Sequence, residues 1–145
     1  MMDTATARTT LARSFAESGM VGRGSTWRQM GSGVQWVVHI ERLPFRRELS
    51  VDVGLDFQVE TRPQGPGNCP VVLGLELMGI VDKATVVEAL DLDSRMSDAS
   101  REQALILMAR ALASFLGSHL TLESVRSAYR AGSMAAGAIR WDARR

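Results

Sequence analysis

Histidine and acidic residues recur at alternating positions in the middle of the chain, and these residue types can carry out acid–base chemistry. The histidine is His39, the carboxylates are Asp52 and Asp56, and Gln35 and Glu41 belong to the same polar series. A carboxylate beside an imidazole raises the imidazole pKa and orients one ring nitrogen, which prepares a general base. His39, Asp52 and Asp56 are therefore the candidate catalytic residues of a small-ligand-binding or hydrolytic site. Alternating polar residues are also what the solvated face of any sheet shows, and we favour this structural interpretation.

The segment that begins at Leu49 is the clearest strand in the sequence. Six apolar residues alternate there with six polar or small ones, which is the pattern of a half-buried antiparallel strand. A turn at residues 43–46 pairs this strand with the one before it. The expected register places His39 outward beside Ser50, and a slip of two residues would place it opposite Asp52 instead.

A β-hairpin is expected upstream of this strand. Gly31 and Ser32 suit a two-residue turn with glycine at its first central position. If Met30 faces Gly33 across that turn, Trp27 lies opposite Trp36 and both indoles face inward. The two tryptophans are therefore predicted to be core residues, and base stacking in a nucleic-acid site is the alternative use of such rings.

Segments on either side of this β-meander complete a single α+β domain over residues 1–145. An opening helix is capped by Asp3 or Thr4 and ends at Gly19, which can take the left-handed conformation. Three prolines and two glycines make residues 62–70 an internal loop. A fourth strand is expected to follow the loop.

The C-terminal half is predicted to be helical. Residues 80–92 favour a short helix over an extended piece. Ser100 and Gln103 fit the capping box of a long helix whose apolar stripe runs to Gly117, and Thr121 begins another helix. The predicted fold class is thus α+β, with an antiparallel meander of about four strands packed against an N-terminal helix and C-terminal helices.

The tip of the second hairpin, at Phe45, Arg46 and Arg47, is the candidate partner-binding segment. A solvated tip is its plainer interpretation, and the alternative is that the tip, the exposed sheet face or an edge strand binds another protein. Because the chain has no catalytic motif, we expect a non-enzymatic interaction module, an accessory or immunity-type subunit that binds a protein partner or a second copy of itself. A small enzyme or ligand-binding domain that works through His39 and Asp52 is the alternative.

Composition argues against several other classes of function. The formal net charge of +1 supplies no global field for nucleic acid or a membrane surface, so neither is expected as a partner. One cysteine, Cys69, and two separated histidines cannot build a zinc site without carboxylates, and no phosphate-binding or dinucleotide motif occurs, so no metal or cofactor is expected. His119 is expected to interact with helix-terminal carbonyls.

The same composition indicates where the protein works. The start of the chain is polar and lacks the pattern of a signal peptide. The most apolar run, Val71 to Val81, is too short to cross a bilayer, which needs about 20 residues. A lone cysteine cannot form an internal disulfide, so nothing points to an oxidising compartment. The sequence therefore predicts a cytoplasmic protein.

The N-terminal half contains the segments "ESGMVGRGSTWRQ" and "VQWVVHIERLPFRRELSVDVGL". With the helix that precedes them, these segments resemble a family of small bacterial domains of unknown function. Members of that family have a leading helix, a glycine-containing step into a strand with tryptophan, a second strand that contains glutamine and valine, and a third strand ending in Val-Gly. The matching positions are Gly19, Trp27, Val34 to Val38, Val53 and Gly54. The resemblance covers residues 8–57 and implies a bacterial α+β protein with no assigned reaction.

Overall fold

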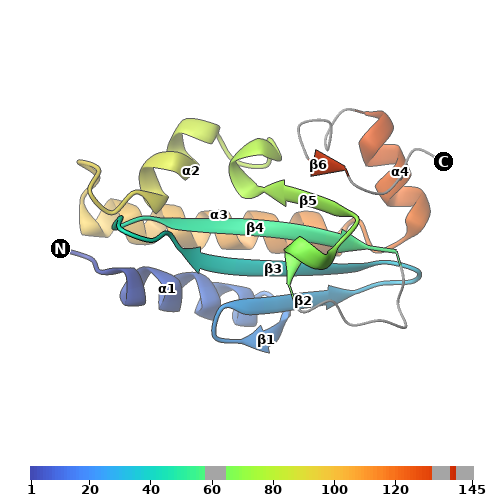
Figure 1. The fold of residues 1–145 in the computed structure, drawn as a ribbon, viewed down its shortest axis with the longest axis horizontal. Coiled ribbons are helices and arrows are strands. Elements are labelled where there is room, and N and C mark those ends of the chain that lie inside the picture. The colour runs from blue at the N-terminus through green and yellow to red at the C-terminus, as the bar shows by residue number, and fades with distance from the viewer. Residues whose placement is uncertain (58–64, 132–137, 140–145) are drawn as a thin grey trace.

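The structure is a computed structural model of the chain, and it describes residues 1–57, 65–131 and 138–139. Its strands form one antiparallel sheet in the order of the sequence (Figure 1). The strands are β1 (Val21–Arg23), β2 (Thr26–Met30), β3 (Gln35–Arg42), β4 (Leu49–Asp56), β5 (Val71–Gly74) and β6 (Ala138–Ile139). The helices are α1 (Thr4–Glu17), α2 (Lys83–Leu90), α3 (Asp98–Gly117) and α4 (Leu122–Arg130). The predicted α+β fold is confirmed, and the short strands β1 and β6 extend the predicted meander at its two edges.

One face of the sheet forms the core with α1 and α3. These two helices pack against each other along the sheet, and α2 and α4 lie near opposite ends of α3 (Figure 1). The apolar stripes of both helices face this core, as their periodicity predicts, and most of their residues are buried, whereas Ala12 and Phe115 are partly exposed. The largest members of the helix side of this core are Leu11, Phe15, Leu105, Met108 and Leu112.

Residues 31–34 form the loop of the β2–β3 hairpin, where the Gly31 N–H donates to the Val34 carbonyl at 2.9 Å. The two-residue turn is therefore centred on Ser32 and Gly33, and its predicted position at Gly31 and Ser32 is wrong by one residue. Trp27 pairs with Val38 and not with Trp36. A shift of two residues leaves every side chain on the same face of the sheet, and both tryptophans are buried as predicted. The loop is held from outside the hairpin, because the Ser32 N–H donates to the Leu120 carbonyl at 2.8 Å.

Gly31, in the same loop, lies too close to the α3–α4 connection for a side chain. A Cβ at this position would overlap the carbonyl oxygen of Leu120. We expect Gly31→Ala to lower the free energy of unfolding by about 1–3 kcal/mol, because backbone must move to admit the methyl group. Urea denaturation measures this, and Gly65→Ala is the matched control because nothing lies within 4 Å of its Cβ position. Equal stability of the two variants would contradict the close contact between this loop and Leu120 of the α3–α4 connection.

The β3–β4 hairpin is longer than predicted, with a tip at residues 43–48. His39 lies opposite Asp52, and Glu41 lies opposite Ser50. The expected position of His39 beside Ser50 is therefore wrong, and the register is the one shifted by two residues. The outward direction of the His39 side chain is unchanged by this shift.

The elements after the internal loop follow the predicted order, with two different boundaries. Ser97 is the N-cap of α3 and accepts a hydrogen bond from the Ser100 N–H at 3.2 Å, so the predicted capping box at Ser100 is wrong. Thr121 caps α4 as predicted, with Ser124 completing a capping box. The short helix predicted within residues 80–92 is α2. The predicted fourth strand ends early, because a 3₁₀ turn follows β5.

The second face of the sheet is partly covered by residues 65–70. A Cβ on Gly54 of β4 would lie 2.6 Å from Pro66 Cα and 2.7 Å from Cys69 Sγ, so glycine allows this close approach. Of the predicted internal loop, residues 62–64 lie outside the described residues. In the described part of the chain no helix has the length and apolar character needed to cross a membrane.

Candidate functional site

The second face of the sheet brings together two of the three candidate catalytic residues. His39 of β3 and Asp52 of β4 are direct cross-strand partners, and both are half-buried. His39 Nδ1 lies 3.1 Å from Thr26 Oγ1, which orients the ring from the β2 side. Among the described residues, however, no hydrogen bond or ion pair joins His39 to Asp52. The imidazole is thus oriented by a hydroxyl group and not by the carboxylate.

Asp56 does not join this pair. It lies at the far end of β4, opposite Gln35, and both side chains are buried. Four residues of extended strand separate it from Asp52, a distance of about 13 Å. The three predicted candidates therefore do not converge on one point.

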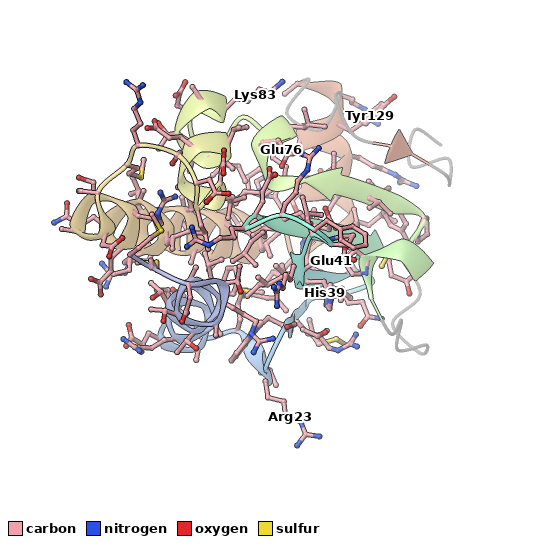
Figure 2. All side chains as sticks on the ribbon, turned by 60° about the vertical axis from the view of Figure 1, so that its left-hand side comes forward. Arg23, His39, Glu41, Glu76, Lys83 and Tyr129 are labelled. Atoms are coloured by element: carbon pink, nitrogen blue, oxygen red, sulfur yellow. The ribbon has the colours of Figure 1, made fainter. Side chains whose placement is uncertain are left out.

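The surroundings of Asp52 favour its protonated form. Burial raises the pKa of Asp52 above its ordinary value of 3.8, and the neighbouring carboxylates Glu41 and Glu76 raise it further. The charge of His39 and a hydrogen bond from Ser50 act in the opposite direction. Figure 2 shows His39 and Glu41 on β3, with Glu76 on the side of β5. The raised pKa means that ionisation of Asp52 destabilises the folded state.

The pH dependence of stability tests this arrangement. Because the folded pKa of Asp52 is raised, its contribution to stability is fully present below its unfolded pKa and is lost as pH rises through the folded value. We therefore expect Asp52→Asn to be more stable than wild type at pH 7, with the difference shrinking towards pH 3. Urea denaturation at both pH values measures the effect. If the variant is less stable than wild type at pH 7, the fold stabilises the ionised form of Asp52 and the expectation is wrong.

The His39–Asp52 pair is half-buried on the second face of the sheet. Neither residue lines the cavities of about 350–700 Å³ whose walls are given by described residues. The described residues also contain no group of three or more histidine, cysteine, aspartate or glutamate side chains placed to hold a metal ion. A substrate site usually has concave walls, so the described geometry gives this pair little support as a catalytic centre.

Phe45, at the tip of the β3–β4 hairpin, combines two unfavourable features. Its side chain is fully exposed, with a relative accessibility of 106%. Its φ angle is +65°, and it is the one non-glycine residue with positive φ among those described. The left-handed region disfavours a bulky side chain by about 1–2 kcal/mol. Neither the exposed ring nor the positive φ angle stabilises the fold, and both therefore indicate that Phe45 has a role other than a structural one.

The two arginines beside Phe45 have different environments. Arg47 is anchored: its Nη1 donates to Asp93 Oδ1 at 2.8 Å and its Nη2 donates to the Met2 carbonyl at 2.7 Å. Arg46 stays exposed, and its nearest charged group is Glu48 at 3.5 Å. Of the three predicted partner-binding residues, Phe45 and Arg46 are therefore presented to solvent, whereas Arg47 holds the tip against the body of the protein.

Two shallow cavities extend from this tip towards α2. One has a volume of about 440 Å³ and the other of about 700 Å³. Val87 of α2, which is 46% exposed, lines the larger one. We call Phe45, Arg46, Val87 and the walls of these two cavities the tip surface. The cavity walls also include Asp91, which belongs to both cavities, and Asp93.

The other sequence candidates are structural. His119 Nδ1 lies 2.6 Å from the Phe115 carbonyl, and the two rings stack at 4.1 Å, so the predicted role at a helix end is confirmed. The His119 carbonyl accepts a hydrogen bond from Trp36 Nε1 at 2.8 Å. Cys69 is buried against Gly54 of β4, so its thiol is not accessible to a substrate.

A scan against protein-family models, a search of curated proteins and a search of solved structures found no match to this chain. The resemblance of residues 8–57 to a family of small bacterial domains therefore stays a prediction.

Proposed function

We propose that this chain is a non-enzymatic protein-interaction module of bacteria, an accessory or immunity-type subunit, and that Phe45 anchors its partner. The observation that carries this proposal is the exposed, left-handed Phe45 on a tip that Arg47 holds in place. We place the protein in the cytoplasm, because its single cysteine, Cys69, forms no internal disulfide.

Binding to a partner would bury the exposed side chain of Phe45. Moving a phenylalanine side chain from water into a partner's apolar pocket releases about 1.5–3 kcal/mol. Aromatic and arginine side chains dominate the binding energy of protein interfaces, and here Arg46 is exposed next to the ring. Because the ion pair of Arg47 with Asp93 already orders the tip, less conformational entropy is lost on binding.

The tip surface also indicates the character of the partner. Its apolar part is formed by Phe45 and Val87, and its charged part has both signs, because Arg46 and Asp93 line the same cavity. A complementary surface would offer an apolar pocket flanked by charges of both signs. Such a mixed pattern favours a protein over nucleic acid, which would require a surface dominated by positive charge.

Affinity capture from the native host tests the proposal. The baits are the intact chain, Phe45→Ser, and Leu107→Ser as a matched control that alters another exposed apolar residue, which lies on α3 and is 58% exposed. We expect a stoichiometric protein partner with wild type and Leu107→Ser, and at least a tenfold loss with Phe45→Ser, which corresponds to about 1.4 kcal/mol. Equal capture by all three baits would reject Phe45 as the anchor.

The cross-strand pairing of His39 with Asp52 favours a second candidate, a small-ligand-binding or hydrolytic site on the second face of the sheet. The double variant His39→Ala, Asp52→Ala is therefore added as a fourth bait. If the interaction module is correct, this variant retains the protein partner. A small molecule that co-purifies with wild type and Phe45→Ser, but not with the double variant, would support the second candidate instead.

A further inference from the structure

The tip surface has a protruding part and a hollow part. The protruding part is the side chains of Phe45 and Arg46. The hollow part is the cavity of about 700 Å³ beside α2, which we call the α2 cavity. The Leu92 N–H donates to the Arg47 carbonyl at 2.8 Å, and Asp91 lines both the α2 cavity and the cavity at the tip. The two parts are therefore adjacent, and Figure 1 shows the β3–β4 hairpin and α2 at the same end of the molecule.

The walls of the α2 cavity match the tip in chemistry. The apolar walls are Ala84 and Val87. The charged walls are three carboxylates and one ammonium group, from Asp82, Glu88, Asp91 and Lys83. Within the described part of the chain, none of these carboxylates takes part in an ion pair. Asp82 and Asp91 accept backbone N–H groups, whereas the Glu88 carboxylate has no hydrogen bond to any described residue.

We propose that the partner of the tip surface is a second copy of this chain, and that Phe45 of each copy enters the α2 cavity of the other. This inference rests on the proposed function, because it names the partner that Phe45 anchors. The ring packs against Val87, and the guanidinium of Arg46 pairs with the carboxylate of Glu88. A volume of about 700 Å³ lies within the range of cavities that enclose small ligands, so it has room for one phenylalanine side chain.

A two-fold axis makes both contacts at once. In a two-fold dimer the same patch of each copy forms the interface, so a residue and its partner residue meet twice. Because the tip and the α2 cavity are adjacent, an axis that passes between them brings each tip to the cavity of the other copy. Such a dimer uses both tips and both cavities, so assembly stops at two copies.

Sedimentation velocity of the full chain tests this dimer. From a dissociation constant of about 10 µM, we expect mainly dimer at about 100 µM protein and mainly monomer at about 1 µM. Phe45→Ser should weaken the dimer at least hundredfold, tenfold for each of the two contacts, and should be monomeric at both concentrations. Leu107→Ser, the matched control on α3, should dimerise like wild type. A wild type that is monomeric at both concentrations, or a Phe45→Ser variant that dimerises like wild type, would overturn the proposal.

An exchange of charges tests the pairing of Arg46 with Glu88. Arg46→Glu and Glu88→Arg each place like charges at both contacts, so each variant alone should be monomeric. In an equimolar mixture, a dimer with one copy of each variant has opposite charges at both contacts, and we expect the dimer to reappear. Its recovery would also show that both variants are folded. A mixture that dimerises no more than either variant alone would overturn the proposal.

The affinity capture separates a failure of this inference from a failure of the proposed function. If the inference is correct, the stoichiometric partner captured from the host is the native copy of this chain. A monomeric chain that captures a different protein through Phe45 would reject the second copy and leave the interaction module in place. A monomeric chain whose Phe45→Ser variant captures as much protein as wild type would reject both.

Dimerisation does not disturb the unfolding measurements. At about 1 µM protein, a dimer with a dissociation constant of about 10 µM adds little to the free energy of unfolding, because binding stabilises a fold only when the partner concentration exceeds that constant.

Discussion

Arg101→Ala is expected to lower the free energy of unfolding by about 3–5 kcal/mol, because several buried carbonyl groups lose hydrogen bonds from a charged donor, each of which contributes about 1.5–3 kcal/mol. Arg101 lies in the first turn of α3, and only 2% of it is exposed. Its guanidinium donates to the C-terminal carbonyls of α2 and to the segment that follows, at distances of 2.8–3.4 Å. The acceptors are the carbonyl groups of Glu88, Ala89, Asp91, Ser94 and Met96 and the hydroxyl group of Ser94. Alanine would leave these buried acceptors without their shared donor.

Two further variants isolate the cause of this loss. Arg101→Lys keeps the charge but lacks the planar fork, so we expect it to recover only part of the stability. Arg110→Ala, at an exposed position of the same helix, should stay within about 0.5 kcal/mol of wild type. Urea denaturation followed by circular dichroism measures all three. If Arg101→Ala unfolds at the same urea concentration as Arg110→Ala, the guanidinium does not join α2 to α3.

Trp36→Ala is expected to lower the free energy of unfolding by about 3–5 kcal/mol, as for other large aromatic residues of a core. Trp36 is fully buried on β3 and packs edge-on against Phe115 of α3, with ring centroids 6.2 Å apart. Its indole N–H donates to the His119 carbonyl at 2.8 Å, which connects the sheet to the end of α3. The same urea titration measures the loss.

Trp36→Phe separates the hydrogen bond from the packing. It keeps most of the apolar contact but leaves the His119 carbonyl without its donor, so we expect a smaller loss of about 1–3 kcal/mol. Equal losses for the alanine and phenylalanine variants would mean that packing against Phe115 contributes little. Unchanged stability in both would contradict the burial of the ring.

Side-chain faces could be predicted from the sequence, but strand register could not. The alternation along β4 correctly assigns the inward and outward positions of the hairpin, including the outward direction of His39. A pattern with period two looks the same after a slip of two residues, so it cannot choose between Ser50 and Asp52 as the partner of His39. That choice depends on contacts with distant segments, such as the bridge between Glu48 and Asp91.

The roles of the arginines could not be predicted for a related reason. Arg47 looks like a solvated tip residue, yet its partner Asp93 lies 46 positions away. Arg101 looks like an exposed position in a helix, yet it is one of the most buried large side chains. In contrast, the segment around Phe45 was identified as a candidate binding tip from its place between two strands. The left-handed backbone at Phe45 has no signal in the sequence, because glycine or asparagine is expected there.

We propose that Phe45 binds a partner and does not stabilise the fold. The variant Phe45→Gly tests this proposal most directly. Glycine relieves the left-handed strain at φ +65°. We predict that the free energy of unfolding of Phe45→Gly is unchanged or higher by up to about 1 kcal/mol, while capture of the partner falls at least tenfold. A variant that is less stable than wild type by more than about 1 kcal/mol and still captures the partner would contradict the claim, because Phe45 would then be a structural residue.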